Sequence, residues 1–172
     1  MPAHKIVLLQ DPVLRQVATA VEDINSDIIQ LLDDMVETMY EAVGIGLAAP
    51  QIGISKRLIV MDCAREDEEP QIWKMINPEI LSRSDETAKM EEGCLSIPGY
   101  HGDVTRPAEI EVAYTDIEGR QQQMQATGLL AACVQHEIDH LNGVLFIDHL
   151  SRLKRDMMMR KIAKDERYSA SA

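Results

Sequence analysis

The stretch LLAACVQHEIDHL, residues 129–141, joins an apolar first half to two histidines and two acids. It is too long and too uniformly apolar in its first half for an ordinary strand, so it predicts a buried helix. Residues four apart lie on one face of a helix, so His136 and His140 can present their imidazoles to one metal ion. Glu137 then projects beside that ion, within reach of a water molecule. The stretch predicts a central helix that carries part of a metal site.

A chance match to this pattern is a weak explanation. The pattern H-E-x-x-H occurs on the order of once in a few hundred random chains of this size. Burying two histidines and two acids on an apolar helix is also costly unless an ion or other partners compensate them. Metal binding is therefore the favoured interpretation of the HEIDH pattern.

The remaining protein ligand is not found downstream by the zinc-peptidase template. Downstream candidates are Asp148, His149 and Asp156. The longer zinc-peptidase motif needs a glycine three residues and a histidine six residues after the second histidine. Gly143 occupies the glycine position, but Phe146 stands where the histidine is required. The downstream template fails.

Upstream, the segment EEGCLSIPGY (91–100) offers Cys94. The segment contains glycines and a proline, which suit a turn and a close backbone approach. A cysteine beside a metal ion is a thiolate and a strong soft ligand. Cys63 and Cys133 lie in apolar runs and are interpreted as small buried hydrophobic residues. Cys94 departs from that setting and is the upstream candidate.

Length and composition limit the class of protein. With 172 residues and 45% hydrophobic content, the sequence predicts one domain over residues 1–172. One Phe, one Trp and ten Met predict an aliphatic core. No apolar run approaches the roughly 18 residues of a membrane span, and the N-terminus MPAHKIVLLQDP does not resemble a targeting segment, so we expect a cytoplasmic protein. Three widely spaced cysteines fit free or metal-bound thiols in a reducing compartment.

The charge is uneven along the chain. The net charge of −12 argues against general binding to DNA, because such binding needs a surplus of Lys and Arg. From Ser151 to the end there are seven Lys/Arg against three Asp/Glu, a net +4, while residues 1–150 carry −16. The basic helix expected over 151–168 is either an ordinary solvated helix or a separate functional surface.

The remaining pattern predicts an α+β fold. Ser26 can cap an amphipathic helix that runs through DIIQLLDDMVETMYEA and stops before the segment GIGLAAPQIG, whose glycines and proline predict an irregular, close-packed path. Short antiparallel strands are expected at 57–61, 72–77, 109–114 and 122–126, separated by turn-rich or charged stretches. These strands would pack around the central HEIDH helix, with one helix before them and one after.

Three separate motifs carry a family resemblance that covers essentially the whole chain. They are GIGLAAPQ (44–51), EGCLS (92–96) and QHEIDHL (135–141), in that order. Together they resemble the bacterial-type peptide deformylases, which remove formate from the N-formyl-methionine of new polypeptides. The resemblance implies Cys94, His136 and His140 as metal ligands, with water in the open position. It favours Fe(II) as the native ion, with Zn, Ni or Co able to occupy the same site.

The resemblance also implies roles for other residues. Glu137 would be the general base, while the Gln51 side-chain amide and the Leu95 backbone N–H would donate to the oxyanion. The backbone of Gly44, Ile45 and Gly46 would hold the peptide like an added strand. The methionine pocket would include Ile45, Leu129, Ala132 and Cys133.

Further expectations concern the surroundings of the site and the tail. Glu92 and Asp139 are candidate acceptors for the ligating histidines, and Arg106 is a candidate ion-pair partner for Glu92. His101 stands where many family members carry arginine, and it is expected to be solvent-exposed. The basic C-terminal helix is expected to bind ribosomal RNA near the exit of the nascent chain.

Three alternatives remain. A zincin-like endopeptidase would need the missing downstream ligand. A closed structural metal site would need a fourth protein ligand, for which Cys133 or His149 is available, and would leave Glu137 and Gln51 unexplained. A catalytically inactive homologue is the third, against which the presence of both Glu137 and Gln51 argues.

Overall fold

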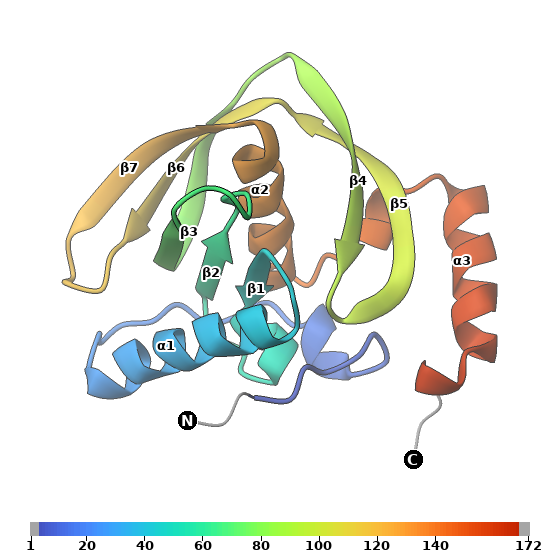
Figure 1. Cartoon of the computed structure of the whole chain (residues 1–172), viewed down its shortest axis with the longest axis horizontal. Helices are drawn as coiled ribbons and strands as arrows, with labels where there is room; N and C mark the ends of the chain where they lie inside the picture. The colour runs from blue at the N-terminus through green and yellow to red at the C-terminus, as the bar shows by residue number, and fades with distance from the viewer. Residues whose placement is uncertain (1–3, 169–172) are drawn as a thin grey trace.

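The computed structural model describes residues 4–168, in which antiparallel sheets pack with three α-helices (Figure 1). The helices are α1 (Ser26–Glu41), α2 (Gly128–Leu141) and α3 (Arg152–Lys164). The strands are β1 (Gly46–Ala48), β2 (Leu58–Asp62), β3 (Ile72–Arg83), β4 (Thr87–Cys94), β5 (Ile97–Pro107), β6 (Glu109–Thr115) and β7 (Gln121–Thr127). The predicted α+β class is confirmed. The outer limits of the predicted domain, residues 1 and 172, lie outside the described residues.

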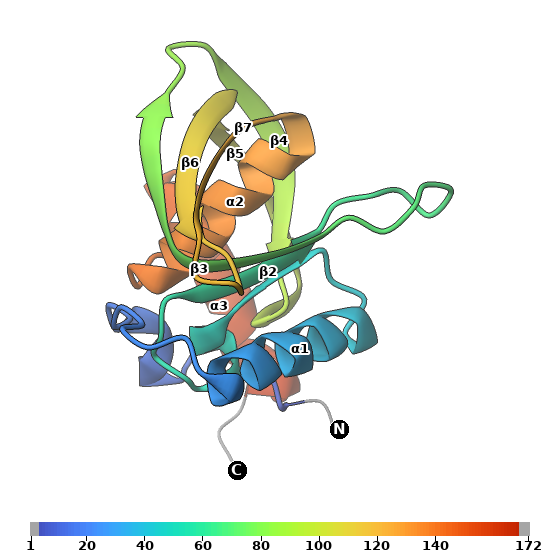
Figure 2. The same ribbon diagram turned by 90° about the vertical axis from the view of Figure 1, so that its left-hand side faces the viewer.

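Five strands form one antiparallel sheet in the order β1-β2-β3-β6-β7, while β4 and β5 form a separate hairpin. Helix α2 lies between this sheet and the hairpin (Figures 1 and 2). Strand β1 is the first in the order and pairs only with β2 among the described strands. The sheet therefore ends in a free strand edge.

Strand β2 is buried on both faces, so its apolar run is continuous rather than alternating. Leu58 and Val60 pack with α1, whereas Ile59 and Met61 pack with α2. This division follows from the alternation of side chains along a strand. The two helices are thereby held on opposite faces of the sheet.

Helix α1 begins one residue away from the predicted cap. Ser26 is the first helical residue, and Asn25 is the N-cap, whose side chain accepts a hydrogen bond from the N–H of Ile28 at 3.1 Å. Asn and Ser are comparable caps, so composition alone did not distinguish the two. The apolar face of α1 buries Leu32, Met35 and Met39 completely.

The β4–β5 hairpin was not among the predicted strands. It carries Cys94 at the end of β4, beside the turn that leads into β5. Ile97 and Val104 of β5 are buried in a cluster with Phe146, Ile162 and residues near both ends of the chain. This packing is distant in sequence, which explains why a local pattern did not reveal it.

The predicted helix over 151–168 is shorter in the structure. Helix α3 ends at Lys164, and a separate 3-10 turn, Glu166–Tyr168, follows Asp165. The Tyr168 hydroxyl donates to the carbonyl of Pro98 at 2.9 Å, and the Tyr100 hydroxyl donates to Asp165 at 3.1 Å. These bonds hold Asp165 and the 3-10 turn against β5. No helix within residues 4–168 is long and apolar enough to cross a membrane.

Candidate active site

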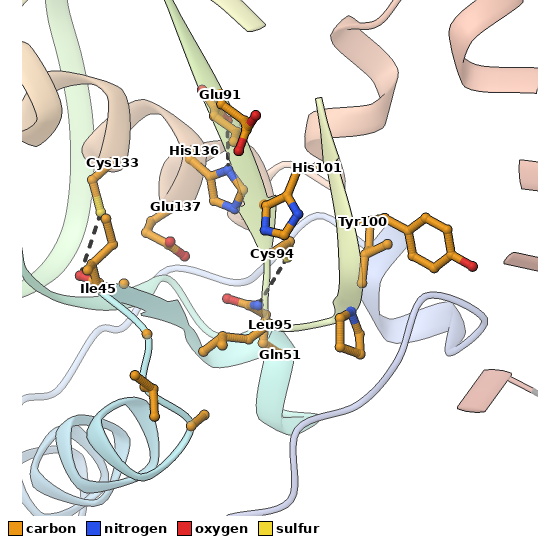
Figure 3. A pocket seen from close by; sticks show the side chains of 18 of the residues that line it. Ile45, Gln51, Glu91, Cys94, Leu95, Tyr100, His101, Cys133, His136 and Glu137 are labelled. Atoms are coloured by element: carbon orange, nitrogen blue, oxygen red, sulfur yellow. Dashed lines mark hydrogen bonds and ion pairs between the residues drawn. The ribbon is translucent and has the colours of Figure 1, made fainter. Parts of the chain in front are cut away.

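The three predicted ligands meet at one point. Donor atoms of Cys94, His136 and His140 all lie within 4.8 Å of one another. Both histidines come from α2, where a spacing of four residues puts their ring centroids 5.0 Å apart. Cys94 comes from the end of β4, and its Sγ lies 3.3 Å from His140 Nε2. Figure 3 shows Cys94 and His136 directed into the same space.

A buried charged network supports His136. Its Nδ1 lies 2.9 Å from Glu92 Oε1, which leaves Nε2 for the metal side of the ring. Glu92 also receives two hydrogen bonds from Arg106, at 2.7 and 3.0 Å. Burial alone would raise the pKa of Glu92, but bonds from His136 and Arg106 outweigh it and lower the pKa to about 2. The expected pairing of Glu92 with Arg106 is therefore present, and Arg106 also reaches Asp139 at 2.9 Å.

Glu137 lies beside the three donors and is 4% exposed. Its Oε1 is one of two buried side-chain atoms in the described chain that lack a hydrogen-bond partner. Burial is the main cause that raises its pKa to about 7. Gly46 makes room for this carboxylate, since a Cβ there would stand 2.5 Å from Glu137 Oε2. A buried carboxylate without a partner, at the base of a cleft, is suited to receive a proton from a bound molecule.

Gln51 is held by three hydrogen bonds and is 1% exposed. Its Oε1 accepts from the N–H of Ala48 at 3.0 Å, and its Nε2 lies 3.2 Å from Ser96 Oγ and 3.4 Å from Cys94 Sγ. The amide N–H₂ is thus aimed at the side of the ligand cluster. Sequence reasoning missed Ser96 as its partner. The only signal in the sequence was the serine inside the EGCLS motif; the structure shows that it is fully buried, where a hydroxyl needs a partner.

A cleft of about 530 Å³ opens over these side chains. The predicted substrate-binding residues Gly44, Ile45, Gly46, Leu129, Ala132 and Cys133 all line it, as do Gln51 and Leu95. Ile45 and Leu129 are 45% and 48% exposed, which separates them from ordinary core residues. One wall of the cleft is formed by the segment that leads into β1, the edge strand of the sheet. The cleft can therefore accept an extended chain beside a free strand edge.

Other predicted candidates lie outside the donor cluster. His149 Nε2 lies 2.8 Å from Asp139, so it belongs to the outer end of the Glu92–Arg106 network. Cys133 Sγ lies 3.7 Å from the carbonyl of Ile45. Within residues 4–168, neither His149 nor Cys133 joins Cys94 and the two α2 histidines as a fourth donor. His101 is exposed as expected, and its ring covers Gly93 at the cleft.

The donor set fits a divalent metal ion. One thiol and two imidazoles, with a neighbouring buried carboxylate and no fourth protein donor among the described residues, have the composition of a catalytic rather than a structural site. The second nitrogen of His136 is already engaged by Glu92, as is usual for a ligating histidine.

A sequence model of the polypeptide deformylase family matches residues 3–156. The chain belongs to the polypeptide deformylase family. It is accordingly a metal-dependent hydrolase that removes the N-formyl group from nascent polypeptides. A peptide deformylase of Rhizobium meliloti (strain 1021) is 58% identical over 95% of this chain and 94% of its own length. One from Agrobacterium fabrum is 55% identical over 97% of this chain and 98% of its own.

Solved deformylase structures share the fold. The peptide deformylase of Synechococcus elongatus, solved with actinonin, superimposes with a TM-score of 0.90 at 45% identity. That comparison covers 100% of this chain and 94% of the other. The enzyme of Ehrlichia chaffeensis, also solved with actinonin, gives a TM-score of 0.91 at 43% identity and covers 97% and 99% of the two chains. The fold and the family assignment therefore agree over nearly the whole chain.

Proposed function

We propose that Cys94, His136 and His140 hold the metal ion of this deformylase and that Fe(II) is the native ion. The observation that carries the proposal is the convergence of their donor atoms within 4.8 Å beside the buried Glu137. Zn, Ni and Co suit the same mixed thiolate and imidazole donors. When bound, the ion supplies positive charge that makes a water molecule more acidic and polarises the formyl carbonyl.

Glu137 is the general base in this proposal. Its unpartnered Oε1 accepts a proton from the attacking water and later returns that proton to the departing amine nitrogen. The Gln51 amide and the backbone N–H of Leu95 donate to the oxygen that becomes negative after attack on the formyl carbon. Gln51 is suited to this role because Ala48 and Ser96 fix its amide, while its second N–H, 3.4 Å from Cys94 Sγ, faces the ligand cluster.

The substrate lies along the cleft in an extended conformation. The segment Gly44–Gly46 offers backbone groups at the free edge of the sheet, so the peptide binds as an added strand. Ile45, Leu129, Ala132 and Cys133 form the wall that receives the methionine side chain. The exposure of Ile45 and Leu129 and the mostly apolar character of all four residues support this assignment.

The test is formate release from formyl-Met-Ala-Ser by anaerobically prepared protein, with metal content measured on the same samples. Glu137→Ala is expected to keep its metal and to lose about 10²–10⁴-fold in turnover, the usual contribution of a general base. Cys94→Ala is expected to lose metal. Glu41→Ala, which removes an exposed carboxylate at the end of α1, serves as the control and is expected to match wild type. Metal-loaded wild type that releases no formate would contradict the proposal.

We also propose that α3 binds ribosomal RNA close to the nascent-chain exit. Among its basic side chains, Arg152, Lys154, Arg160, Lys161 and Lys164 are exposed, against an acidic body. Figure 1 shows α3 at the side of the molecule, away from α1. Phosphate backbones attract such a surface. A ribosomal partner also agrees with the cytoplasmic location expected from the sequence.

Charge substitution is a cleaner test of this idea than removal of the tail. Deleting 152–172 would also remove Ile162 and Tyr168, which are buried in the cluster that supports β5. Lys154→Glu, Arg160→Glu and Lys161→Glu combined should weaken co-sedimentation with ribosomes and spare turnover of a short formyl peptide. The matched control reverses Lys56, Arg83 and Lys89, three exposed cations outside α3. Equal co-sedimentation of both triple variants with ribosomes would contradict the proposal that α3 binds ribosomal RNA.

A further inference from the structure

Two thiols that take no part in the proposed chemistry, those of Cys63 and Cys133, pack in one apolar cluster beside the cleft. Cys63 directly follows β2 and is half-buried, and Cys133 lies on α2, one turn before His136. Both pack in the same apolar cluster, between α2 and the sheet. The two thiols also influence each other directly, since each is the main cause of the shifted pKa of the other. The two sulfurs are thus adjacent although 69 intervening residues separate them in the chain.

This pair adjoins the wall that binds the substrate. Cys133 lines the cleft, and its Sγ lies 3.7 Å from the carbonyl oxygen of Ile45. The same carbonyl accepts from the N–H of Asp62 at 2.9 Å, one residue before Cys63. A Cβ at Gly46 would stand 2.9 Å from the Cys133 sulfur. A displacement of the Cys133 sulfur therefore changes its contacts with Ile45 and Gly46. Figure 3 shows Cys133 directed at Ile45.

We propose that Cys63 and Cys133 form a redox-active pair, which hydrogen peroxide converts to an intramolecular disulfide, and that this disulfide lowers turnover by moving the Cys133 sulfur away from Ile45. The effect on turnover rests on the proposed role of Ile45 and Cys133 in substrate binding. The formation of the disulfide does not depend on that role.

The chemistry balances with peroxide as the oxidant. The Cys63 thiolate attacks one oxygen of hydrogen peroxide, the O–O bond breaks, and Cys63 becomes a sulfenic acid. The other oxygen leaves as hydroxide, which takes up the proton that the Cys63 thiol had lost and becomes water. The Cys133 sulfur then attacks the Cys63 sulfur, the S–O bond breaks, and a second water carries away the Cys133 proton. Two thiols and one peroxide give one disulfide and two waters. A dithiol reductant returns two electrons and two protons and restores both thiols.

The surroundings of the two thiols determine which of them reacts with peroxide first. The neighbouring Cys133 thiol lowers the pKa of the Cys63 thiol, whereas the Cys63 thiol and burial raise the pKa of Cys133. Cys63 is also the more exposed of the two, so it is the sulfur that peroxide reaches. The third cysteine, Cys94, contacts Gln51 and His140 instead.

The test treats nickel-loaded full-length protein with hydrogen peroxide, removes the peroxide with catalase, blocks the remaining thiols and maps the peptides by mass spectrometry. We expect the peptides of Cys63 and Cys133 to be joined, the nickel to be retained and Cys94 to remain a free thiol. The value of kcat/KM for formyl-Met-Ala-Ser should fall about tenfold, as expected when a substrate-positioning group is displaced. Dithiothreitol should reverse both changes.

Cys63→Ser and Cys63→Val are the matched variants, because Cys63 is outside the cleft lining and the proposed machinery. Both should keep the untreated activity and resist reversible inactivation. The proposal is overturned if Cys63 is oxidised to a sulfinic acid while Cys133 stays free, if the joined peptides form without loss of turnover, or if the variants lose activity reversibly as wild type does. The joined peptide is measured without an activity assay. Lack of formate release by untreated protein would therefore contradict the proposed function but not the proposed disulfide between Cys63 and Cys133.

Discussion

His136 Nδ1 lies 2.9 Å from Glu92 Oε1, and this contact determines which nitrogen of the imidazole faces Cys94 and His140. Glu92 is in turn held by two hydrogen bonds from Arg106. A strand residue of the β4–β5 hairpin thereby orients a ligand on α2. The metal donors are connected through this buried network as well as through the backbone.

Glu92→Gln is expected to weaken metal binding by about 10–100-fold, because loss of an acceptor behind a ligating histidine costs that much in other metal sites. The neutral amide also leaves Arg106 without its closest counter-charge. The measurement is competition between the protein and a chelator for nickel or cobalt.

Glu91→Gln is the control for this change. It removes the same charge from the adjacent residue of β4, whose side chain is exposed. Chelator competition equal to wild type is expected for Glu91→Gln, and the same result for Glu92→Gln would refute the orienting role.

Gln51→Ala is expected to lower kcat by about 10²–10³-fold, the usual cost of one oxyanion donor. Metal content should stay close to wild type, since Gln51 contacts the ligand Cys94 without belonging to the donor set. Ser96→Ala removes only the partner that holds the amide, so a smaller loss is expected. Equal losses in kcat for the two variants would indicate that Gln51 acts by holding the loop rather than by donating to substrate.

Much of the fold could be predicted from local patterns. The HEIDH helix, the amphipathic α1 and strands β6 and β7 carry their own periodicity and turn residues, so their existence was correctly predicted. The hairpin that carries Cys94 was missed because its sequence mixes charged residues with glycine and proline. Its strands are stabilised by each other and by contacts with residues such as Phe146, which are far away in the sequence.

The convergence of the candidate ligands follows only in part from local sequence patterns. His136 and His140 follow from helix periodicity, whereas Cys94 needed the resemblance, because no spacing rule joins a strand end to a histidine 42 residues later. The contact of Cys63 with Cys133 could not be predicted at all. The sequence indicates only that both cysteines are apolar core residues, and it is the packing of α2 on the sheet that brings them together.

Metal identity should control sensitivity to air. Iron-loaded protein is expected to lose activity in air, while nickel- and cobalt-loaded protein persists, because a thiolate beside Fe(II) is prone to oxidation. The measurement is formate release over time in air, repeated in Cys63→Ser. The same metal dependence in that variant would assign the decay to the Cys94 site. Equal decay with all three metals would count against the prediction.

Acid should weaken the ion pair between Arg15 and Asp148, which lies outside the metal site. Arg15 donates to both carboxylate oxygens, at 2.6 and 3.2 Å, and the N–H of Leu145 adds a bond at 3.0 Å. Burial acts to raise the pKa of Asp148, but these hydrogen bonds outweigh it and lower the pKa below its usual range. A carboxyl whose pKa is lower in the folded state stabilises the fold above its unfolded pKa of about 3.9 and loses that contribution as pH falls toward the folded value.

Asp148→Asn should therefore reduce the free energy of unfolding at pH 7 by about 0.5–1 kcal/mol, a value that allows for solvent screening of this partly exposed pair. The difference from wild type should shrink below about pH 4, where the wild-type carboxyl becomes protonated. Urea unfolding of both metal-free proteins at pH 7 and at pH 3 measures this difference. Asp23→Asn, which alters an exposed carboxyl before α1, is the control and should show no such pH-dependent difference. If the free energy of unfolding of Asp148→Asn differs from that of wild type by the same amount at both pH values, the variant acts through packing. A contribution from the charge of Asp148 would be lost when the carboxyl is protonated.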